Sequence, residues 1–192
     1  MNIEIKHDKT KKVLFSGDYN NIKEAVEHAI KTRVNLAYAD LAYADLSRVD
    51  LSYVDLSCSN LCCSNLSHSN LSYTNLSYTD LSYTNLISAN LIRANLIRAN
   101  LMKANLSYVN LSRANLFGSD LSCTTLFRAD LSRANLSYTD LSYANLMKAN
   151  LFRSDLIWAD LSYANLSCTT LFKADLTGAN LFHTYLSEVI NN

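Results

Sequence analysis

The chain contains no proline, and its only glycines among 192 residues are Gly17, Gly118 and Gly178. Antiparallel sandwiches and barrels of this size need many tight turns, which glycine and proline normally supply. The sequence also lacks any run of about 18 apolar residues, the length that crosses a bilayer, and its N-terminal residues lack the apolar segment of a signal peptide. These absences argue against an antiparallel sheet fold and predict a cytoplasmic protein without a membrane segment.

An excess of charge of either sign is absent too, because 17 lysines and arginines balance 17 aspartates and glutamates. The total charge therefore indicates neither a polyanion-binding protein nor a DNA mimic, and a charged surface can arise only from how the charges are distributed. The five cysteines form an odd set without the spacing of a zinc site, since Cys62 and Cys63 are adjacent. We expect free thiols in a reducing compartment, with no metal and no cofactor.

Residues 1–33 predict a small hairpin followed by one helix. Ile3 and Ile5 alternate with polar neighbours, residues 8–10 make a polar tip, and an apolar stretch follows at 13–15. Asn21 and Glu24 have the spacing of a capping box, and apolar residues at positions 22, 25, 26, 29 and 30 share one helical face. Because these elements bury little surface alone, we expect them to cap the segment that follows.

From Leu36 to Leu186 every fifth residue is leucine, 31 times in succession. A straight helix would rotate successive leucines by about 140°, and a continuous strand would place them on alternate faces, so neither can gather them. The residue two before each leucine is small or β-branched, the next is almost always Asp or Asn, and the two after it vary. Each unit therefore predicts a short strand and a solvent-facing corner, with leucines directed at a common axis.

This pattern, seen in residues 39–43 and 94–98, resembles the pentapeptide repeat proteins across about 80% of the chain. The resemblance implies an all-β solenoid, a right-handed parallel four-sided β-helix in which twenty residues complete one coil. Residues 34–188 then form about eight coils, between an N-terminal cap of hairpin and helix at 1–33 and a tail at 189–192. At about 4.8 Å per coil the rod would be roughly 37 Å long.

Within this fold the leucines form a stacked core, represented by Leu56, Leu76, Leu96, Leu106, Leu116 and Leu136. A filled axis leaves no pocket, the corner serines have no adjacent base, and the four histidines are scattered, so we expect no catalytic site and no enzyme. Hydroxyl groups at the inward small position, such as those of Ser64 and Thr74, are expected to find partners in neighbouring coils.

Coils of twenty residues place positions twenty apart in columns. One column contains five consecutive cations, Arg93, Arg113, Arg133, Arg153 and Lys173. The opposite side carries an acidic column together with several tyrosines; its aspartates are Asp40, Asp80, Asp120, Asp140 and Asp160. Two interpretations stay open: the corner residues are distributed incidentally, or they form a docking surface, on the arginine side for an acidic or nucleic-acid partner or on the aspartate side for a basic partner. Phosphates along a nucleic-acid strand are spaced more widely than the coils, which argues against nucleic acid as the partner.

The leading hypothesis is a non-enzymatic interaction or scaffold protein that binds a macromolecule, a protein in preference to a nucleic acid. The resemblance supplies an alternative, because some pentapeptide repeat proteins resemble acidic B-form DNA, bind type II topoisomerase and affect fluoroquinolone resistance. Zero net charge and the short tail after Leu186 separate this chain from them. Because Asn191 interrupts the leucine pattern, we expect an open last coil and either a monomer or a dimer through that coil.

Overall fold

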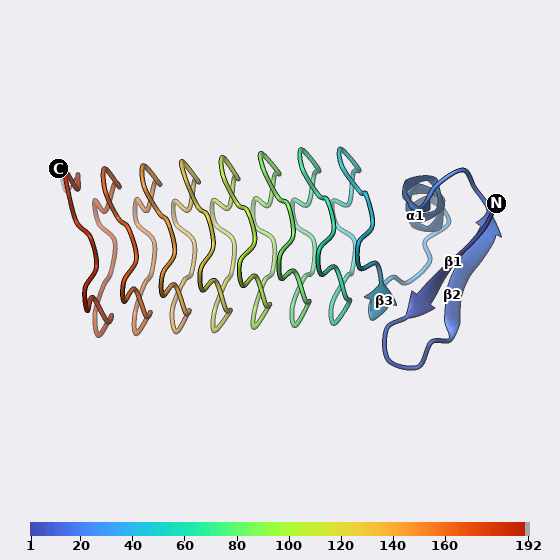
Figure 1. The fold of residues 1–192 in the computed structure, drawn as a ribbon, viewed down its shortest axis with the longest axis horizontal. Coiled ribbons are helices and arrows are strands. Elements are labelled where there is room, and N and C mark those ends of the chain that lie inside the picture. The colour runs from blue at the N-terminus through green and yellow to red at the C-terminus, as the bar shows by residue number, and fades with distance from the viewer. Residues whose placement is uncertain (191–192) are drawn as a thin grey trace.

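The computed structural model describes residues 1–190, which form a compact N-terminal unit and a long regular rod (Figure 1). Strands β1 (Asn2–His7) and β2 (Val13–Asp18) precede helix α1 (Ile22–Lys31), and β3 (Ala39–Asp40) begins the rod. The predicted interruption at Asn191 lies outside the described residues.

The N-terminal strands are joined to the rod by a shared sheet. β1 pairs antiparallel with β2, as the alternation of Ile3 and Ile5 predicts, and on its other edge it pairs antiparallel with β3. The second pairing places Lys6 opposite Asp40 and His7 opposite Ala39. His7 also stacks on Tyr38, with ring centroids 5.0 Å apart, and its Nδ1 accepts the backbone N–H of Lys9. His7 therefore has a structural role at this junction.

Helix α1 begins after Asn21, whose side-chain oxygen accepts the N–H of Glu24 at 2.9 Å. The Glu24 carboxylate accepts the backbone N–H of Asn20, one residue before the position that a capping box would use. The side-chain amide of Asn20, and then its backbone N–H, lower the pKa of Glu24. Ala25, Val26 and Ala29 are buried, so the predicted apolar face packs inward.

The rod is held together by backbone hydrogen bonds between successive coils. Residues at the Asp/Asn position form parallel bridges with residues twenty further along, from Asp40 with Asn60 to Thr170 with Ile190. Each coil also donates in both directions: the N–H of Leu106 bonds the carbonyl of Thr125, and that of Asn105 bonds the carbonyl of Thr84. Twenty residues therefore complete one coil, and the regular trace in Figure 1 follows from repeating these bonds.

The corners have a backbone conformation that sequence inspection missed. The second residue after every leucine from Leu36 to Leu186 has a φ between +53° and +70°, although only Gly118 and Gly178 among these residues are glycines. The N–H of the following residue bonds the leucine carbonyl, as from Ala39 to Leu36, which fits a type II turn. The left-handed conformation costs an ordinary residue about 1–2 kcal/mol. The N–H of the corner residue offsets this by bonding the next coil, as from Tyr38 to the carbonyl of Ser57.

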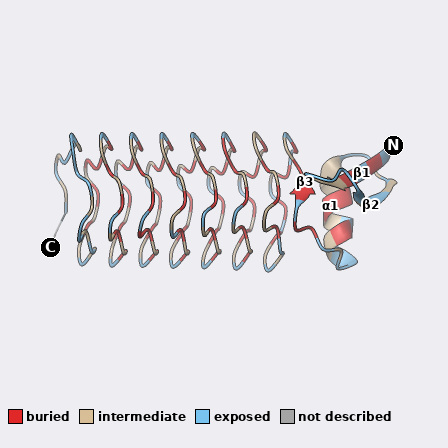
Figure 2. Ribbon diagram, turned by 90° about the horizontal axis from the view of Figure 1, so that it is seen from below, coloured by how far each residue is buried: buried red, intermediate tan, exposed pale blue. Residues whose placement is uncertain are grey.

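The leucine side chains fill the axis of the rod, and buried residues recur along it in Figure 2 until the last coil. The six representative core leucines have no exposed surface: Leu56, Leu76, Leu96, Leu106, Leu116 and Leu136. Burial ends at the last coil, where Leu181 is 40% and Leu186 48% exposed, and these leucines line an open apolar hollow of about 500 Å³. Among the described residues, the leucines are therefore buried next to the N-terminal unit and partly exposed in the last coil.

The inward hydroxyl groups only partly follow the expectation of partners in neighbouring coils. Thr74 does so, because it donates to the carbonyl of Leu51 in the preceding coil at 2.7 Å. Ser69 donates instead to the carbonyl of Leu66 in its own corner, at 2.6 Å. Ser64 Oγ, within residues 1–190, is the buried side-chain oxygen left without a partner. The expectation is wrong for Ser69 because a β-hydroxyl reaches the leucine carbonyl three residues earlier without crossing to another coil.

Candidate functional site: a column of unpaired cations

The structure brings the five predicted cations together along one edge of the rod. Backbone bonds join the consecutive corners directly, from the N–H of Arg93 to the carbonyl of Ser112 and from that of Arg113 to Ser132. All five side chains are exposed. We call this set the basic column; it consists of Arg93, Arg113, Arg133, Arg153 and Lys173.

None of these cations is paired with a carboxylate in the part of the chain that the structure describes. The ion pairs within residues 1–190 join Lys6 to Glu4 and Lys11 to Asp8 and Asp40, all at the N-terminal end. Like charges one coil apart, about 4.8 Å, repel each other, although water and salt screen exposed groups. An anionic partner would relieve that repulsion.

Aromatic rings contact the cations at both ends of the basic column, Arg93 at one end and Arg153 and Lys173 at the other. The Arg93 guanidinium donates to the Tyr73 hydroxyl at 3.4 Å and lies over its ring. Arg153 lies over the ring of Phe152 in its own corner, with the guanidinium carbon 5.1 Å from the ring centroid. The sequence did not predict this contact between Phe152 and Arg153. Adjacent side chains of a strand point in opposite directions, whereas the two adjacent side chains of these corners lie together.

The middle of the basic column borders a shallow hollow of about 530 Å³. Its polar wall consists of arginines and serines and its ends are aromatic; the lining residues are Tyr73, Ile92, Arg93, Ser112, Arg113, Ser132, Arg133, Asn150 and Phe152. Beyond Tyr73 the aromatic surface continues, because Tyr53 stacks on it at 4.9 Å with ring planes 6° apart. Arginine and aromatic side chains are enriched in protein interfaces, so this surface has the composition of a docking site.

The acidic column differs from the basic column in how far it reaches into solvent. Its five aspartates, Asp40, Asp80, Asp120, Asp140 and Asp160, are half-buried. From Asp80 onward Oδ1 accepts the backbone N–H two residues later, at 3.0 Å from Ser82 and 2.8 Å from Ser122. This is an Asx turn, in which the side chain fastens its own corner. One oxygen of each such carboxylate is therefore engaged by the backbone.

Asparagines of the same column link one coil to the next. Asn100 donates from Nδ2 to Oδ1 of Asp80 at 3.1 Å, and Asn180 donates in the same way to Asp160 at 3.0 Å. Asp120, Asp140 and Asp160 follow one another without an intervening asparagine, so this stretch lacks such a donor. The Asp/Asn position thus serves mainly to bond corner to corner.

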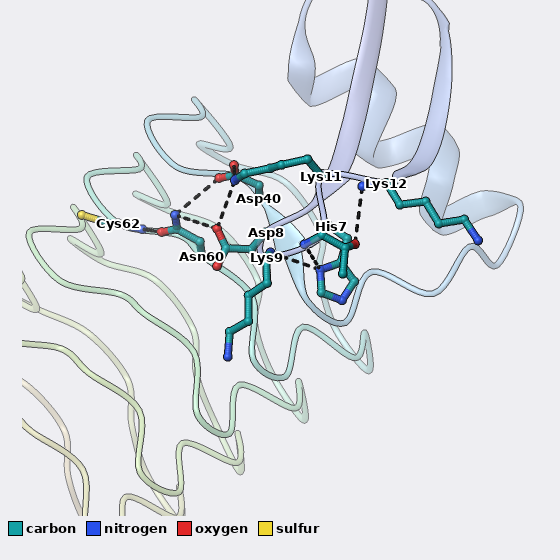
Figure 3. A network of polar contacts seen from close by, with 9 residues as sticks. His7, Asp8, Lys9, Lys11, Lys12, Asp40, Asn60 and Cys62 are labelled. Carbon is teal, nitrogen blue, oxygen red and sulfur yellow. Dashed lines mark hydrogen bonds and ion pairs between the residues drawn. The ribbon is translucent and has the colours of Figure 1, made fainter.

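Asp40, the first aspartate of the acidic column, is tied to the N-terminal hairpin (Figure 3). Lys11 Nζ lies 2.9 Å from Asp40 Oδ2 and 3.6 Å from Asp8 Oδ1. Asn60 Nδ2 approaches both carboxylates, at 3.4 Å and 3.5 Å. The bond to Asp40 is the main cause that raises the pKa of Lys11. Asp40 therefore contributes to the junction, with its charge already paired.

Other candidate chemistry is sparse in the described chain. The five cysteines are free thiols. No three His, Cys, Asp or Glu side chains within residues 1–190 converge in a way that could hold a metal ion. The helix of the described segment is also too short and too polar to cross a bilayer.

Comparison with known proteins places the repeat in a defined family. The model for pentapeptide repeats matches in eight copies that together extend from residue 32 to residue 187. No match was found among curated proteins.

Solved structures include similar chains. HetL, a pentapeptide repeat protein involved in heterocyst differentiation regulation in Nostoc sp. strain PCC 7120, is 32% identical over 88% of this chain and 96% of its own, with a TM-score of 0.42. Rfr23 from Cyanothece 51142 is 43% identical, with a TM-score of 0.41; the match covers 48% of this chain and 60% of Rfr23. Full-length QnrB1, a plasmid-mediated fluoroquinolone resistance protein, is 17% identical over 77% of this chain and 79% of its own, with a TM-score of 0.52. The chain therefore belongs to the pentapeptide repeat family and folds as a right-handed β-helix solenoid.

Proposed function

We propose that the chain is a non-enzymatic protein-interaction protein whose basic column binds an acidic segment of a partner protein. The supporting observation is that five exposed cations stand in consecutive coils without a carboxylate partner within residues 1–190. Complementary charge accelerates encounter and selects among partners more than it adds affinity. The aromatic rings beside Arg93 and Arg153 add apolar contact area.

The rod offers a rigid frame for such a surface. We infer a four-sided cross-section, because each coil of twenty residues carries four backbone bridges to the next. Residues 1–33 act as a cap that covers the first coil and residues 34–188 are the repeat domain, although Ile190, in the expected tail, still bridges Thr170. The free thiols support a reducing, cytoplasmic location. A monomer, or a dimer through the C-terminal coil, leaves the basic column accessible.

A fluorescein-labelled polyglutamate peptide tests the proposal directly. Replacing Arg113, Arg133 and Arg153 together by glutamine should weaken its binding at least about tenfold and reduce the salt dependence of the affinity. Fluorescence anisotropy at two salt concentrations measures both. Duplex and single-stranded DNA of matched charge should bind more weakly than the peptide.

A matched variant controls for the loss of three positive charges. Arg98→Gln, Arg128→Gln and Lys148→Gln together remove three cations outside the basic column and should leave peptide affinity within about twofold of the original. Equal weakening by both triple variants, absent peptide binding, or a preference for DNA would contradict the proposal.

The alternative function is that of a DNA-mimicking binder of DNA gyrase, which would affect fluoroquinolone susceptibility. The likeness to QnrB1 extends to the fold alone at 17% identity, and the unpaired cations are a poor match to a DNA mimic. A gyrase supercoiling assay over a range of protein concentrations separates the two functions. Inhibition of supercoiling, or protection of gyrase from the drug, would favour the alternative.

A further inference from the structure

Two adjacent cysteines lie side by side at one corner of the rod. Cys62 Sγ and Cys63 Sγ are 3.3 Å apart, and both residues are half-buried. Neighbouring residues of an extended strand point to opposite faces, so a pair of adjacent cysteines normally separates its sulfurs. The corner conformation, with φ of Cys63 at +59°, removes that separation.

The same arrangement recurs at other corners that carry two large side chains. The ring centroids of Phe182 and His183 are 4.1 Å apart, and the guanidinium carbon of Arg128 lies 5.4 Å from the ring centroid of Phe127. Proximity of the two corner side chains is thus a property of the repeat. Residues 62–63 are the one corner in the sequence where both are cysteines, so here the repeat creates a dithiol.

Polar side chains surround this pair, which is partly exposed to solvent. The Ser82 hydroxyl, one coil further, donates to Cys62 Sγ at 3.4 Å. The Cys62 thiol, and then burial, raise the pKa of the Cys63 thiol, which keeps it protonated at neutral pH and slows its oxidation. Tyr43 and Tyr83 flank Cys63 in the neighbouring coils of its column.

We propose that Cys62 and Cys63 form a two-thiol binding site for a trivalent arsenical. Thiolates are soft ligands that bind soft metal and arsenic centres. The distance between the two sulfurs determines which coordination geometry such a centre can have. We take a bond length of about 2.3 Å between the centre and each sulfur, as for zinc–sulfur bonds. A linear two-coordinate centre would then need the sulfurs about 4.6 Å apart, whereas a sulfur–centre–sulfur angle near 90° needs them about 3.3 Å apart. The pyramidal geometry of trivalent arsenic meets the second condition, while zinc would require further ligands that this corner lacks.

The reaction balances without an oxidant. A monosubstituted arsenous oxide, R–As=O, condenses with the two thiols: two S–H bonds break, two As–S bonds form, and the oxygen leaves with both protons as one water molecule. The cyclic product needs little backbone movement because the sulfurs already lie 3.3 Å apart. The site is independent of the proposed docking function.

Phenylarsine oxide is the probe that tests the site. The reduced full-length chain should take up one equivalent, seen by intact mass as one adduct with loss of one water, and should lose two of its five titratable thiols. An excess of monothiol should leave the adduct in place, and a small dithiol should remove it. Cys62→Ser and Cys63→Ser should each weaken retention about 100-fold, because the second bond no longer forms within the molecule.

A variant that retains Cys62 and Cys63 as its only cysteines shows whether these two thiols suffice for binding. Cys58→Ser, Cys123→Ser and Cys168→Ser together should still bind one equivalent with unchanged affinity. Loss of the adduct in this triple variant, equal retention by Cys62→Ser or Cys63→Ser, or uptake without loss of two thiols would each overturn the proposal. Matching circular dichroism spectra establish that all variants are folded.

Discussion

The indole ring of Trp158 lies directly against Gly178, the equivalent corner residue of the next coil. A β-carbon placed on Gly178 would stand 2.7 Å from the indole Cδ2, closer than such atoms come in proteins. The same glycine has a φ of +70°. Two requirements therefore coincide at this corner, left-handed backbone and space for a ring.

Gly178→Ala should displace the indole and destabilise the fold by about 1–3 kcal/mol, combining left-handed strain with overpacking. Because Trp158 is the single tryptophan of the chain, its emission spectrum reports the displacement without interference. Gly118→Ala is the matched control: its β-carbon would lie 3.6 Å from Arg98 Cγ, an ordinary contact, so only the backbone cost applies. Identical tryptophan spectra for both variants and the original chain would contradict the packing relationship.

The leucine core predicts a gradient of sensitivity along the rod. Leu106→Ala should lower the free energy of unfolding by about 2–5 kcal/mol, because a fully buried side chain leaves a cavity that the stacked coils cannot close. Leu181→Ala should cost less than half as much, since Leu181 is already 40% exposed. Chemical denaturation followed by circular dichroism measures both. Equal costs would mean that the last coil is covered in solution.

Ser64 and Ser69 provide a test of buried hydrogen bonding at equivalent positions one repeat apart. Ser69→Ala should destabilise by about 1 kcal/mol, because it removes the bond to the Leu66 carbonyl. Ser64→Ala should be neutral or stabilising by up to about 1 kcal/mol, because the Ser64 hydroxyl is buried without a partner. Thermal or urea unfolding compares them. A loss at Ser64 as large as that at Ser69 would show that the Ser64 hydroxyl is bonded in solution.

Acid should weaken the rod through the aspartates of the Asx turns. The Ser52 side chain and backbone lower the pKa of Asp50, and the backbone N–H of Ser47 is the main cause that lowers the pKa of Asp45. A carboxyl whose folded pKa is depressed adds stability above its unfolded pKa of about 3.9, and that stability is lost as pH falls through the folded value. We therefore expect the loss to begin near pH 4.

Asparagine at both positions separates titration from hydrogen bonding. The variant Asp45→Asn with Asp50→Asn keeps the oxygen that accepts the corner N–H, so its stability should change little at pH 7 and fall less steeply below pH 4 than that of the original chain. Unfolding midpoints of the variant and the original chain, measured between pH 3 and pH 7, test this expectation. Parallel pH dependences of the two midpoints would exclude a contribution from these carboxylates.

Sequence periodicity predicted the positions of β1, β2 and α1 and the inward leucines, because each depends on spacing within a few residues. It assigned the aspartates of the acidic column to a surface, and it could not see that Asp80 bonds its own corner while Asp40 is paired with Lys11. Nor could it detect left-handed corners, since glycine, the usual signal, occurs at only two of them. The bonding of the aspartates and the left-handed corners both depend on a backbone conformation that the residue composition does not predict.

The five-residue period by itself determined that the chain is a solenoid with a leucine axis, because neither a straight helix nor a flat strand can align every fifth residue. The tertiary structure alone decided which side chains meet. Stacking at twenty residues per coil put Arg93 on Tyr73 and Trp158 on Gly178, and the turn at each corner put Cys62 beside Cys63. These contacts depend on the pitch of the coil and the left-handed φ of its corners, and the hydrogen bonds between coils set both.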